Sequence, residues 1–200
     1  MSDRHTTGHW ARYNSGQTTR PVRDLCRRAM TLAGPGNGRT AIDLGCGAGR
    51  ETRALLDAGW RVLAIDSEPG TEALLLRAIG GRHPALTVRT SGFEDLSSLP
   101  EADLIHAGYS LPYQRRESFD RLWTVLRSRL RPGGRLAVNV FGEHDSWAGD
   151  PAMTFFGVAE ARSLVDGLEI EHWHEEDAPG PAFGGPKHWH VFEFIARRPS

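Results

Sequence analysis

The sequence predicts an α/β fold in which a mostly parallel sheet is covered by helices on both faces. Short apolar segments bounded by turn residues alternate along the chain with amphipathic segments of helical periodicity. A glycine-rich loop joins the first apolar segment to the next helix, and the last two apolar segments have no helix between them. Alternating strands and helices build parallel sheets, because each crossover helix lies on one face of the sheet.

The first half of the chain begins with a polar, irregular segment over residues 1–20 and then alternates helix and strand. Apolar residues at spacings of three and four predict a helix over 21–33, which a proline opens and a glycine-rich turn ends. A buried strand over 40–44 precedes a helix over 49–58, which Gly59 closes. The same pattern continues with a strand over 61–65, a helix over 69–79 and a strand over 86–90.

The second half contains the longest helical pattern and a different ending. After a strand over 102–107, large apolar residues fall on one side of a predicted helix over 117–130, which RPGG at 131–134 ends. The remaining predicted elements are a strand over 135–141, a helix over 158–165 and strands over 168–174 and 188–196. Residues 175–187 are rich in proline and glycine and hold no crossover helix, so the last two strands should pair antiparallel.

Composition and charge narrow the class of function. The 200 residues carry a net charge of −1, which gives no general attraction to nucleic acid or to an anionic membrane. Arginines cluster over 20–28 and 115–131, where solvated helix faces are the simplest interpretation. Cys26 and Cys46 show no metal-ligand spacing and fit a reducing compartment. With no signal-peptide pattern and no apolar run of about 20 residues, we expect a cytoplasmic protein without a membrane partner.

The loop over residues 41–49, AIDLGCGAG, is the strongest chemical signal in the chain. Its glycines allow the backbone to turn tightly and to approach a ligand, and the helix beyond offers free N–H groups. Asp66 ends the next strand, where a carboxylate can accept both hydroxyls of a ribose. A dinucleotide fingerprint would place its third glycine at position 50, but Arg50 stands there and the glycine comes one residue early. The sequence therefore predicts a nucleotide-like ligand other than a dinucleotide.

Asp43–Gly49 resembles the first motif of class I S-adenosylmethionine-dependent methyltransferases. Asp66 resembles their ribose-binding acid, and LRPGGR at 130–135 is similar to the turn before their fifth strand. The resemblance implies S-adenosylmethionine (SAM) as cofactor and a Rossmann-like seven-stranded sheet of order 3-2-1-4-5-7-6 with the last strand antiparallel. The resemblance covers about residues 22–198. With no internal repeat and no low-complexity linker, we expect one methyltransferase domain over 1–200, in which 21–200 form the core and 1–20 form a segment that either covers the cofactor or frays.

The same resemblance implies a set of cofactor contacts. The glycine loop would surround the methionyl part, Asp43 would help to hold its amino group, and Asp66 would bind the ribose. Where the family often has an acid that meets the adenine, this chain has Gly92, so we assign that contact to Phe93 and Glu94. The complete predicted cofactor set is Asp43, Gly45, Cys46, Gly47, Gly49, Asp66, Ser67, Phe93, Glu94, Ala107 and Tyr13.

Acceptor contacts should come from the carboxyl ends of the fourth and fifth strands and from the start of the last strand. The predicted substrate residues are Tyr109, Tyr113, Trp147 and His188. SLPY at 110–113 is similar to the motif of amino-methyltransferases, although a plain loop with tyrosines lining the pocket is the alternative. Trp147 either walls the substrate or caps the core.

His188 and His190 are the candidate general bases, because histidine titrates near neutral pH. They share one strand face, while Lys187 and Trp189 share the other. Buried, hydrogen-bonded histidines are the alternative. We predict no metal, because no carboxylate or cysteine completes a recognisable ligand set with the histidines.

The function predicted from these features is methyl transfer to a small molecule by in-line displacement, in which positioning and exclusion of water supply much of the rate. The attacked atom stays open. The alternatives are a methyltransferase that docks RNA or protein on the helix over 115–131, and a SAM-binding module without catalysis.

Overall fold

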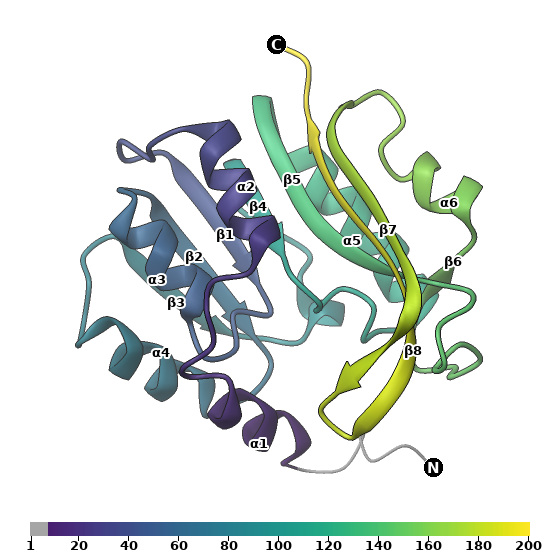
Figure 1. Ribbon diagram of the computed structural model, residues 1–200. Helices are drawn as coiled ribbons and strands as arrows, with labels where there is room; N and C mark the ends of the chain where they lie inside the picture. The colour runs from purple at the N-terminus through teal and green to yellow at the C-terminus, as the bar shows by residue number, and fades with distance from the viewer. Residues whose placement is uncertain (1–7) are drawn as a thin grey trace.

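The computed structural model describes residues 8–200, and the elements alternate along the chain as expected (Figure 1). The first half comprises α1 (His9–Gly16), α2 (Asp24–Ala33), β1 (Thr40–Leu44), α3 (Arg50–Asp57), β2 (Arg61–Asp66), α4 (Thr71–Ile79), β3 (Leu86–Thr90) and the short 3₁₀ turn η2 (Phe93–Asp95). The second half comprises β4 (Ala102–Ala107), α5 (Arg116–Arg129), β5 (Leu130–Gly142), β6 (Phe155–Phe156), α6 (Val158–Ser163), β7 (Glu169–Ala182) and β8 (Gly185–Arg197). No helix within residues 8–200 is both long and apolar enough to cross a membrane.

One sheet runs through the protein in the order β3-β2-β1-β4-β5-β8-β7, and the two-residue β6 pairs with β5 outside this path. The strands from β3 to β5 are parallel, whereas β8 is antiparallel to both β5 and β7. The predicted order and the reversed last strand are confirmed. The short β6 was not predicted, so the sixth and seventh predicted strands are β7 and β8 here. Parallel strands bring their carboxyl ends to the same edge of a sheet, so the loops after β1, β2 and β4 meet there.

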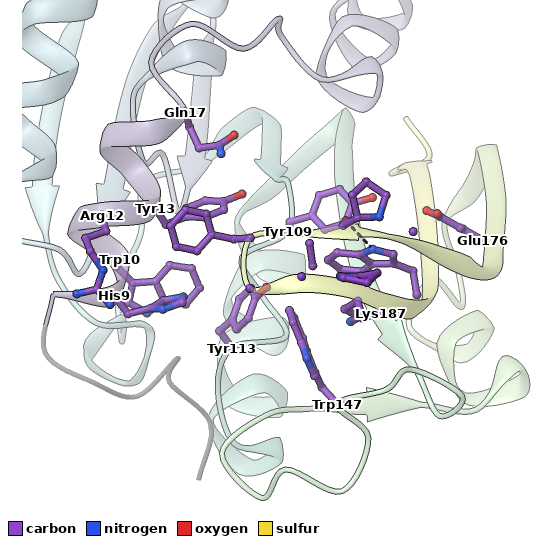
Figure 2. Close-up of a pocket in the computed structure, with 18 of the residues that line it drawn as sticks. His9, Trp10, Arg12, Tyr13, Gln17, Tyr109, Tyr113, Trp147, Glu176 and Lys187 are labelled. Carbon is purple, nitrogen blue, oxygen red and sulfur yellow. Dashed lines mark hydrogen bonds between the residues drawn. The ribbon is translucent and has the colours of Figure 1, made fainter.

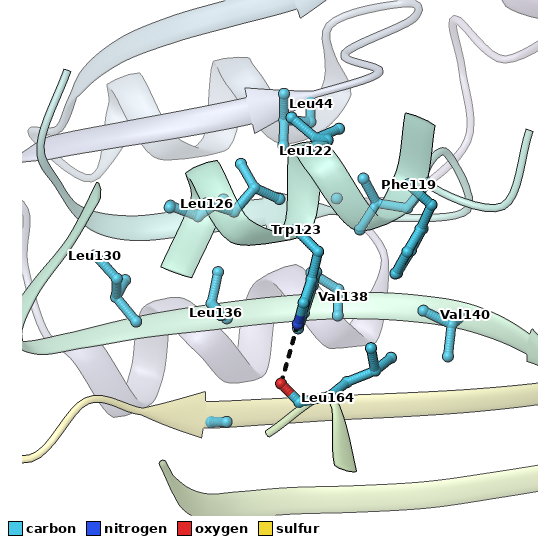
Figure 3. Close-up of a cluster of buried hydrophobic side chains, with 14 of the residues drawn as sticks. Leu44, Phe119, Leu122, Trp123, Leu126, Leu130, Leu136, Val138, Val140 and Leu164 are labelled. Atoms are coloured by element: carbon cyan, nitrogen blue, oxygen red, sulfur yellow. Dashed lines mark hydrogen bonds between the residues drawn. The ribbon is translucent and has the colours of Figure 1, made fainter. Parts of the chain in front are cut away.

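Two clusters of buried side chains cover the two faces of the sheet. Residues of α5 and α6 pack with those of the central strands on one face (Figure 3), and residues of α2, α3 and α4 pack on the other. Alternation along β5 sends Leu136, Val138 and Val140 to the first cluster and Ala137 to the second. Trp123 of α5 also donates an indole hydrogen bond to the carbonyl of Leu164, 3.0 Å away, which fastens α5 to the end of α6.

The last hairpin is longer than the sequence predicts. β7 and β8 pair from Glu169/Arg197 to Ala182/Gly185, with one register shift between Ile170 and His172, so the expected connection over 175–187 is strand for most of its length. β5 pairs with β8 only as far as Val191. Beyond that point the hairpin is a two-stranded ribbon, whose prolines are tolerated because an edge strand needs no hydrogen-bond donor on its free side. The ribbon projects past the sheet toward α1 (Figure 1).

Two local predictions differ from the structure for physical reasons. The polar segment predicted as irregular contains α1, a helix of weak helix formers that aromatic contacts stabilise, including Trp10 against Tyr113 at 4.8 Å between ring centroids. Residues 1–7 of the predicted N-terminal segment lie outside the described residues. The RPGG turn lies inside β5, where the pairing with β4 shifts register between Ala102 and Leu104.

Candidate functional site

Two cavities open side by side at the carboxyl edge of the parallel strands. The first, of about 270 Å³, is lined by residues 45–48, Asp66, Ser67 and 92–94, and we call it the glycine-loop cavity. The second, of about 710 Å³, lies against the hairpin and is lined by tryptophans, tyrosines and Phe183; we call it the aromatic cavity (Figure 2). Residues that line both cavities are Trp10, Tyr13, Gln17, Arg23, Tyr109 and Tyr113. The two spaces therefore share a junction.

The glycine loop is held in a conformation that only glycine adopts easily. Gly45, Gly47 and Gly49 all have positive φ angles, of 71°, 49° and 75°. A Cβ atom at Gly45 would lie 2.3 Å from the Cβ of Ser110, so the loop after β4 packs directly on the backbone there. The Ser110 hydroxyl donates a 2.7 Å hydrogen bond to the carbonyl of Leu44, which ties the two loops together.

Asp66 braces the floor of the glycine-loop cavity. One carboxylate oxygen accepts the N–H of Gly47 at 2.8 Å, and the other accepts the N–H of Glu68 at 2.9 Å. Burial raises the pKa of Asp66 above its ordinary value, although these hydrogen bonds oppose the rise. The Thr71 hydroxyl also hydrogen-bonds to this carboxylate. Because an ionised carboxylate has about four acceptor sites, it keeps room for a ligand hydroxyl.

Glu94 occupies the position that the missing acid at Gly92 left open. Gly92 and Phe93 line the same cavity, and the Glu94 carboxylate lies so close to Gly92 that a Cβ there would be 2.6 Å from its Oε1. A carboxylate therefore reaches this end of the cavity from two residues further along the chain. This geometry supports the predicted pair of Phe93 and Glu94.

Three predicted cofactor residues lie behind the cavity wall. Asp43 is buried and accepts hydrogen bonds from the Thr52 hydroxyl at 2.6 Å and from the His106 ring at 2.9 Å. Gly49 packs against Leu75 of α4, and Ala107 is buried in the core. Asp43 is thus placed to hold the loop from beneath rather than to touch a ligand. The other predicted cofactor residues line the cavity: Gly45, Cys46, Gly47, Asp66, Ser67, Phe93, Glu94 and Tyr13.

The segment between α1 and α2 is clamped over the glycine-loop cavity. The Arg20 guanidinium donates two hydrogen bonds of 2.6 Å to the two carboxylate oxygens of Glu51, at the start of α3. Burial alone would raise the pKa of Glu51, but the hydrogen bonds and charge of Arg20 lower it to about 2. This clamp holds α1, with Tyr13 and Asn14, at the cavity wall.

The loop after β4 places two tyrosines at the junction. Tyr109 and Tyr113 line both cavities, and Trp147 from the loop after β5 lines the aromatic cavity (Figure 2). Tyr109 has a φ angle of 55°, a backbone conformation that is costly for a bulky residue and that often marks functional sites. Burial raises the pKa of its phenol to about 12. The structure therefore brings together three of the four predicted substrate residues.

His188 and His190 are placed away from both cavities. Lys187 and Trp189 line the aromatic cavity, so the two histidines project from the opposite face of β8. His188 hydrogen-bonds to Asp177 at 2.5 Å, and His190 is fully buried and stacked on His144. On the face of β8 that lines the aromatic cavity, Lys187 and Trp189 stand in place of the predicted histidines.

The hydrogen bonds of His190 determine which of its ring nitrogens carries the proton. Its Nδ1 accepts the backbone N–H of His144 at 3.0 Å, so the ring proton lies on Nε2, which donates to Glu175. His144, Asp177 and His190 lie close enough together to suggest a metal site. His190 has no free lone pair to offer a metal or a substrate proton, however, so we interpret this cluster as a fastening of the hairpin.

Two side-chain contacts at the aromatic cavity could not be predicted from the sequence. The Lys187 ammonium pairs with Asp145, whose side chain is completely buried and also accepts the N–H of Trp147 at 3.0 Å. Arg23 lies 4.6 Å above the Tyr109 ring. Neither arrangement follows from local sequence, because the partners are 42 and 86 positions apart.

Comparison with known proteins finds similarity to methyltransferases and to a carboxymethyltransferase. Residues 41–134 match the family model described as a methyltransferase domain. The probable cobalt-precorrin-6B C(15)-methyltransferase (decarboxylating) of Methanothermobacter thermautotrophicus is 31% identical over 126 residues, which cover 62% of each chain. The tRNA U34 carboxymethyltransferase of a Shewanella species is 34% identical over 107 residues, 52% of this chain and 32% of that protein. The chain thus spans less than two thirds of either relative.

A solved structure shows the same fold over almost the whole chain. The N-methyltransferase NodS of Bradyrhizobium japonicum, in complex with S-adenosyl-L-homocysteine (SAH), superposes with a TM-score of 0.68. The match covers 96% of this chain and 89% of that one at 17% identity.

Proposed function

We propose that this chain is a class I, S-adenosylmethionine-dependent methyltransferase that transfers the methyl group of SAM to a small molecule bound in the aromatic cavity; the methyltransferase-domain match over residues 41–134 and the fold shared with NodS support this. The observation that carries this proposal is the shared junction. A donor held in the glycine-loop cavity and an acceptor held in the aromatic cavity would meet between Tyr13, Tyr109 and Tyr113.

The donor would lie along the glycine-loop cavity. Asp66 would accept the ribose hydroxyls, and Phe93 and Glu94 would contact the adenine. Residues 45–47 would pack on the methionyl part, for which the positive φ angles leave room. The methyl group then points to the junction. In-line attack on it requires only a positioned nucleophile and little water, and rings from α1 and the β4 loop would supply both conditions. In this proposal α1 is the cover of the cofactor.

An RNA acceptor is the alternative that the tRNA-modifying relatives raise, and the surface of α5 argues against it. Arg116 pairs with Asp120 and Glu160, and Arg131 pairs with Glu101 and Asp103. Arg127 donates to two backbone carbonyls. These three arginines are already engaged within the fold, which leaves the exposed Arg115 and Arg121 as the cations of this segment best placed to meet phosphates. The cytoplasmic location predicted from the sequence stays part of the proposal.

Replacing Asp66 with alanine tests the donor site. We expect SAM and SAH affinity to fall by about 5- to 150-fold, the scale of about 1–3 kcal/mol for a lost hydrogen bond to a charged group. Titration calorimetry measures this directly, with Asp57→Ala on the exposed end of α3 as the matched control. Unchanged affinity in Asp66→Ala would contradict the site. Transfer of radiolabelled methyl from SAM to a metabolite extract, but not to RNA, would support the acceptor class.

A further inference from the structure

The junction between the two cavities holds one fixed charge. Of the six residues that line both cavities, five are neutral and the sixth is Arg23. Its guanidinium lies over the Tyr109 ring and donates a 3.3 Å hydrogen bond to the Tyr13 hydroxyl. The place where donor and acceptor would meet is therefore aromatic and positively charged.

The junction lacks a group that could remove a proton from the acceptor. None of the six shared residues, among the described part of the chain, is a carboxylate or a histidine. The phenol of Tyr109, with a pKa raised to about 12 by burial, stays protonated near neutral pH and acts as a donor. An acceptor that reacts here must bring a nucleophilic atom that is already deprotonated.

Electrostatics favour a negative acceptor for the same reason. The sulfonium of SAM adds a second positive charge beside Arg23, in a partly buried space where charges are weakly screened. The aromatic cavity is lined by three cationic side chains, Arg12, Arg23 and Lys187, and by one carboxylate, Glu176. This excess of positive charge, together with the sulfonium that SAM would bring, favours an anionic acceptor over an amine in its ammonium form.

The far wall of the aromatic cavity presents another cation. Lys187 is the only lysine of the chain, since the remaining basic residues other than histidine are arginines. It is buried, and its ammonium lies 3.5 Å from the ring centroid of Trp147 and 3.8 Å from that of Trp189. A buried ammonium is costly unless it is paired, and the fully buried Asp145 supplies the partner. The chain thus holds a single ammonium rigidly between two indoles that line the cavity.

The rings of this cavity suit a flat ligand. Trp10 meets Tyr113 at 4.8 Å and Tyr109 meets Trp189 at 5.9 Å, in both cases edge to face. Such walls offer ring faces and edges to a planar molecule, which they bind better than a flexible chain of the same size.

We propose that the acceptor is a planar aromatic or heteroaromatic molecule that carries an ionised oxygen, and that Arg23 and Lys187 are the residues that select its charge. This inference rests on the proposed function and names the substrate class of the same site. In the reaction a lone pair of the acceptor attacks the methyl carbon, the carbon–sulfur bond breaks, and its electron pair stays on sulfur. The products are the methylated acceptor and neutral SAH. No proton moves, because the attacking oxygen is already ionised, and its negative charge cancels the positive charge of the sulfonium.

The test measures binding of matched probes to the SAH complex by titration calorimetry. The probes are 2-naphthoate, the neutral 2-naphthamide, the cationic 2-naphthylmethylamine, and octanoate as an anion without a ring. We expect 2-naphthoate to bind about tenfold more tightly than each of the other three, as one charge-assisted hydrogen bond would give. Equal or tighter binding of the amide or the amine overturns the proposal, as does no binding of 2-naphthoate at millimolar concentration.

Variants assign the preference to residues. Arg23→Met should reduce the preference for naphthoate over naphthamide to about threefold or less, while Arg28→Met, on the exposed face of α2, should leave it unchanged. Lys187→Met leaves Asp145 unpaired and is prone to unfold, so the double variant Lys187→Met/Asp145→Asn removes both charges together. Full retention of the preference in both Arg23→Met and the double variant overturns the assignment.

The failure of this inference is distinguishable from failure of the proposed function. Titration with SAH alone comes first: no SAH binding contradicts the proposed function. SAH binding with no preference for the anionic ring contradicts only the acceptor class.

Discussion

The glycine-loop side and the hairpin side of this protein are built in different ways. The glycine-loop cavity is formed by short segments at the ends of β1, β2 and β3, and its key contacts are made to backbone N–H groups. The aromatic cavity is assembled from α1, the loops after β4 and β5, and the tip of the hairpin, and its contacts are made by side chains. A fixed backbone frame suits a constant donor, and a side-chain surface suits an acceptor that differs among enzymes of one fold.

The largest effect should come from the hairpin side. Asp145→Ala leaves the buried Lys187 ammonium without its partner, so the free energy of unfolding should fall by about 3–5 kcal/mol. Urea unfolding measures the loss. Since Asp145 lines neither cavity, SAH affinity of the folded fraction should be almost unchanged, which separates the two sides. A variant as stable as the original protein would show that the pair contributes little.

On the glycine-loop side, the Arg20–Glu51 clamp should dominate acid stability. The pKa of Glu51 is lowered to about 2, so its contribution is complete above the unfolded value of about 4.3 and is lost as pH falls toward 2. The lowered pKa corresponds to a stabilisation of about 3 kcal/mol at neutral pH. Glu51→Gln should therefore lower stability at pH 7 and flatten its decline between pH 4.5 and about 2, as thermal unfolding across that range would show. An unchanged acid decline would argue against the clamp.

Gly45→Ala tests the backbone frame itself. A left-handed conformation costs a residue with a Cβ about 1–2 kcal/mol, and contact with Ser110 must also be relieved, so stability should fall by about 2 kcal/mol. SAH binding should be lost while naphthoate still binds the aromatic cavity. Gly16→Ala, where a Cβ meets no atom within 4 Å, is the control for calorimetry and melting. Loss of both ligands would mean that the cavities do not act separately.

The smallest effect should come from the exposed pairs of Asp177 with His144 and His188, on the face of the hairpin away from the cavities. Hydrogen bonds from His188 and His144 lower the pKa of Asp177 to about 2, and the same contact raises the pKa of His144. The Asp177 contribution is lost as pH falls from about 4 toward 2, and the His144 contribution is present below about 6.5 and lost as pH rises through its raised pKa. Asp177→Asn should therefore lower the melting temperature slightly at pH 5–6 and hardly at all at pH 9. A larger loss at pH 9 would contradict the assignment.

The same contrast explains what the sequence could predict. The alternation of strands and helices, the reversed last strand and the position of the glycine loop follow from local patterns, because hydrophobic period and glycine positions act over short stretches of chain. The full strand order and the cofactor contacts came from the family resemblance of Asp43–Gly49 and Asp66. The burial of Asp43 behind the cavity wall could not be predicted, because its partners Thr52 and His106 come from other parts of the chain. The aromatic cavity depends on segments far apart in the chain, so its tyrosines could be predicted from their loop, but the Asp145–Lys187 pair could not. The predicted bases failed to reach the site because the alternation of β8 turns Lys187 and Trp189 inward instead. The one sequence signal for the Asp145–Lys187 pair was Lys187 itself, the single lysine in an arginine-rich chain.

A crystal structure of the complex with SAH tests the two-cavity account most directly. We predict the ribose hydroxyls on Asp66, the adenine beside Phe93 and Glu94, and the sulfur facing Tyr109 and Tyr113 with open space toward Trp147. SAH bound with its sulfur turned away from the aromatic cavity, or bound outside the glycine-loop cavity, would contradict it.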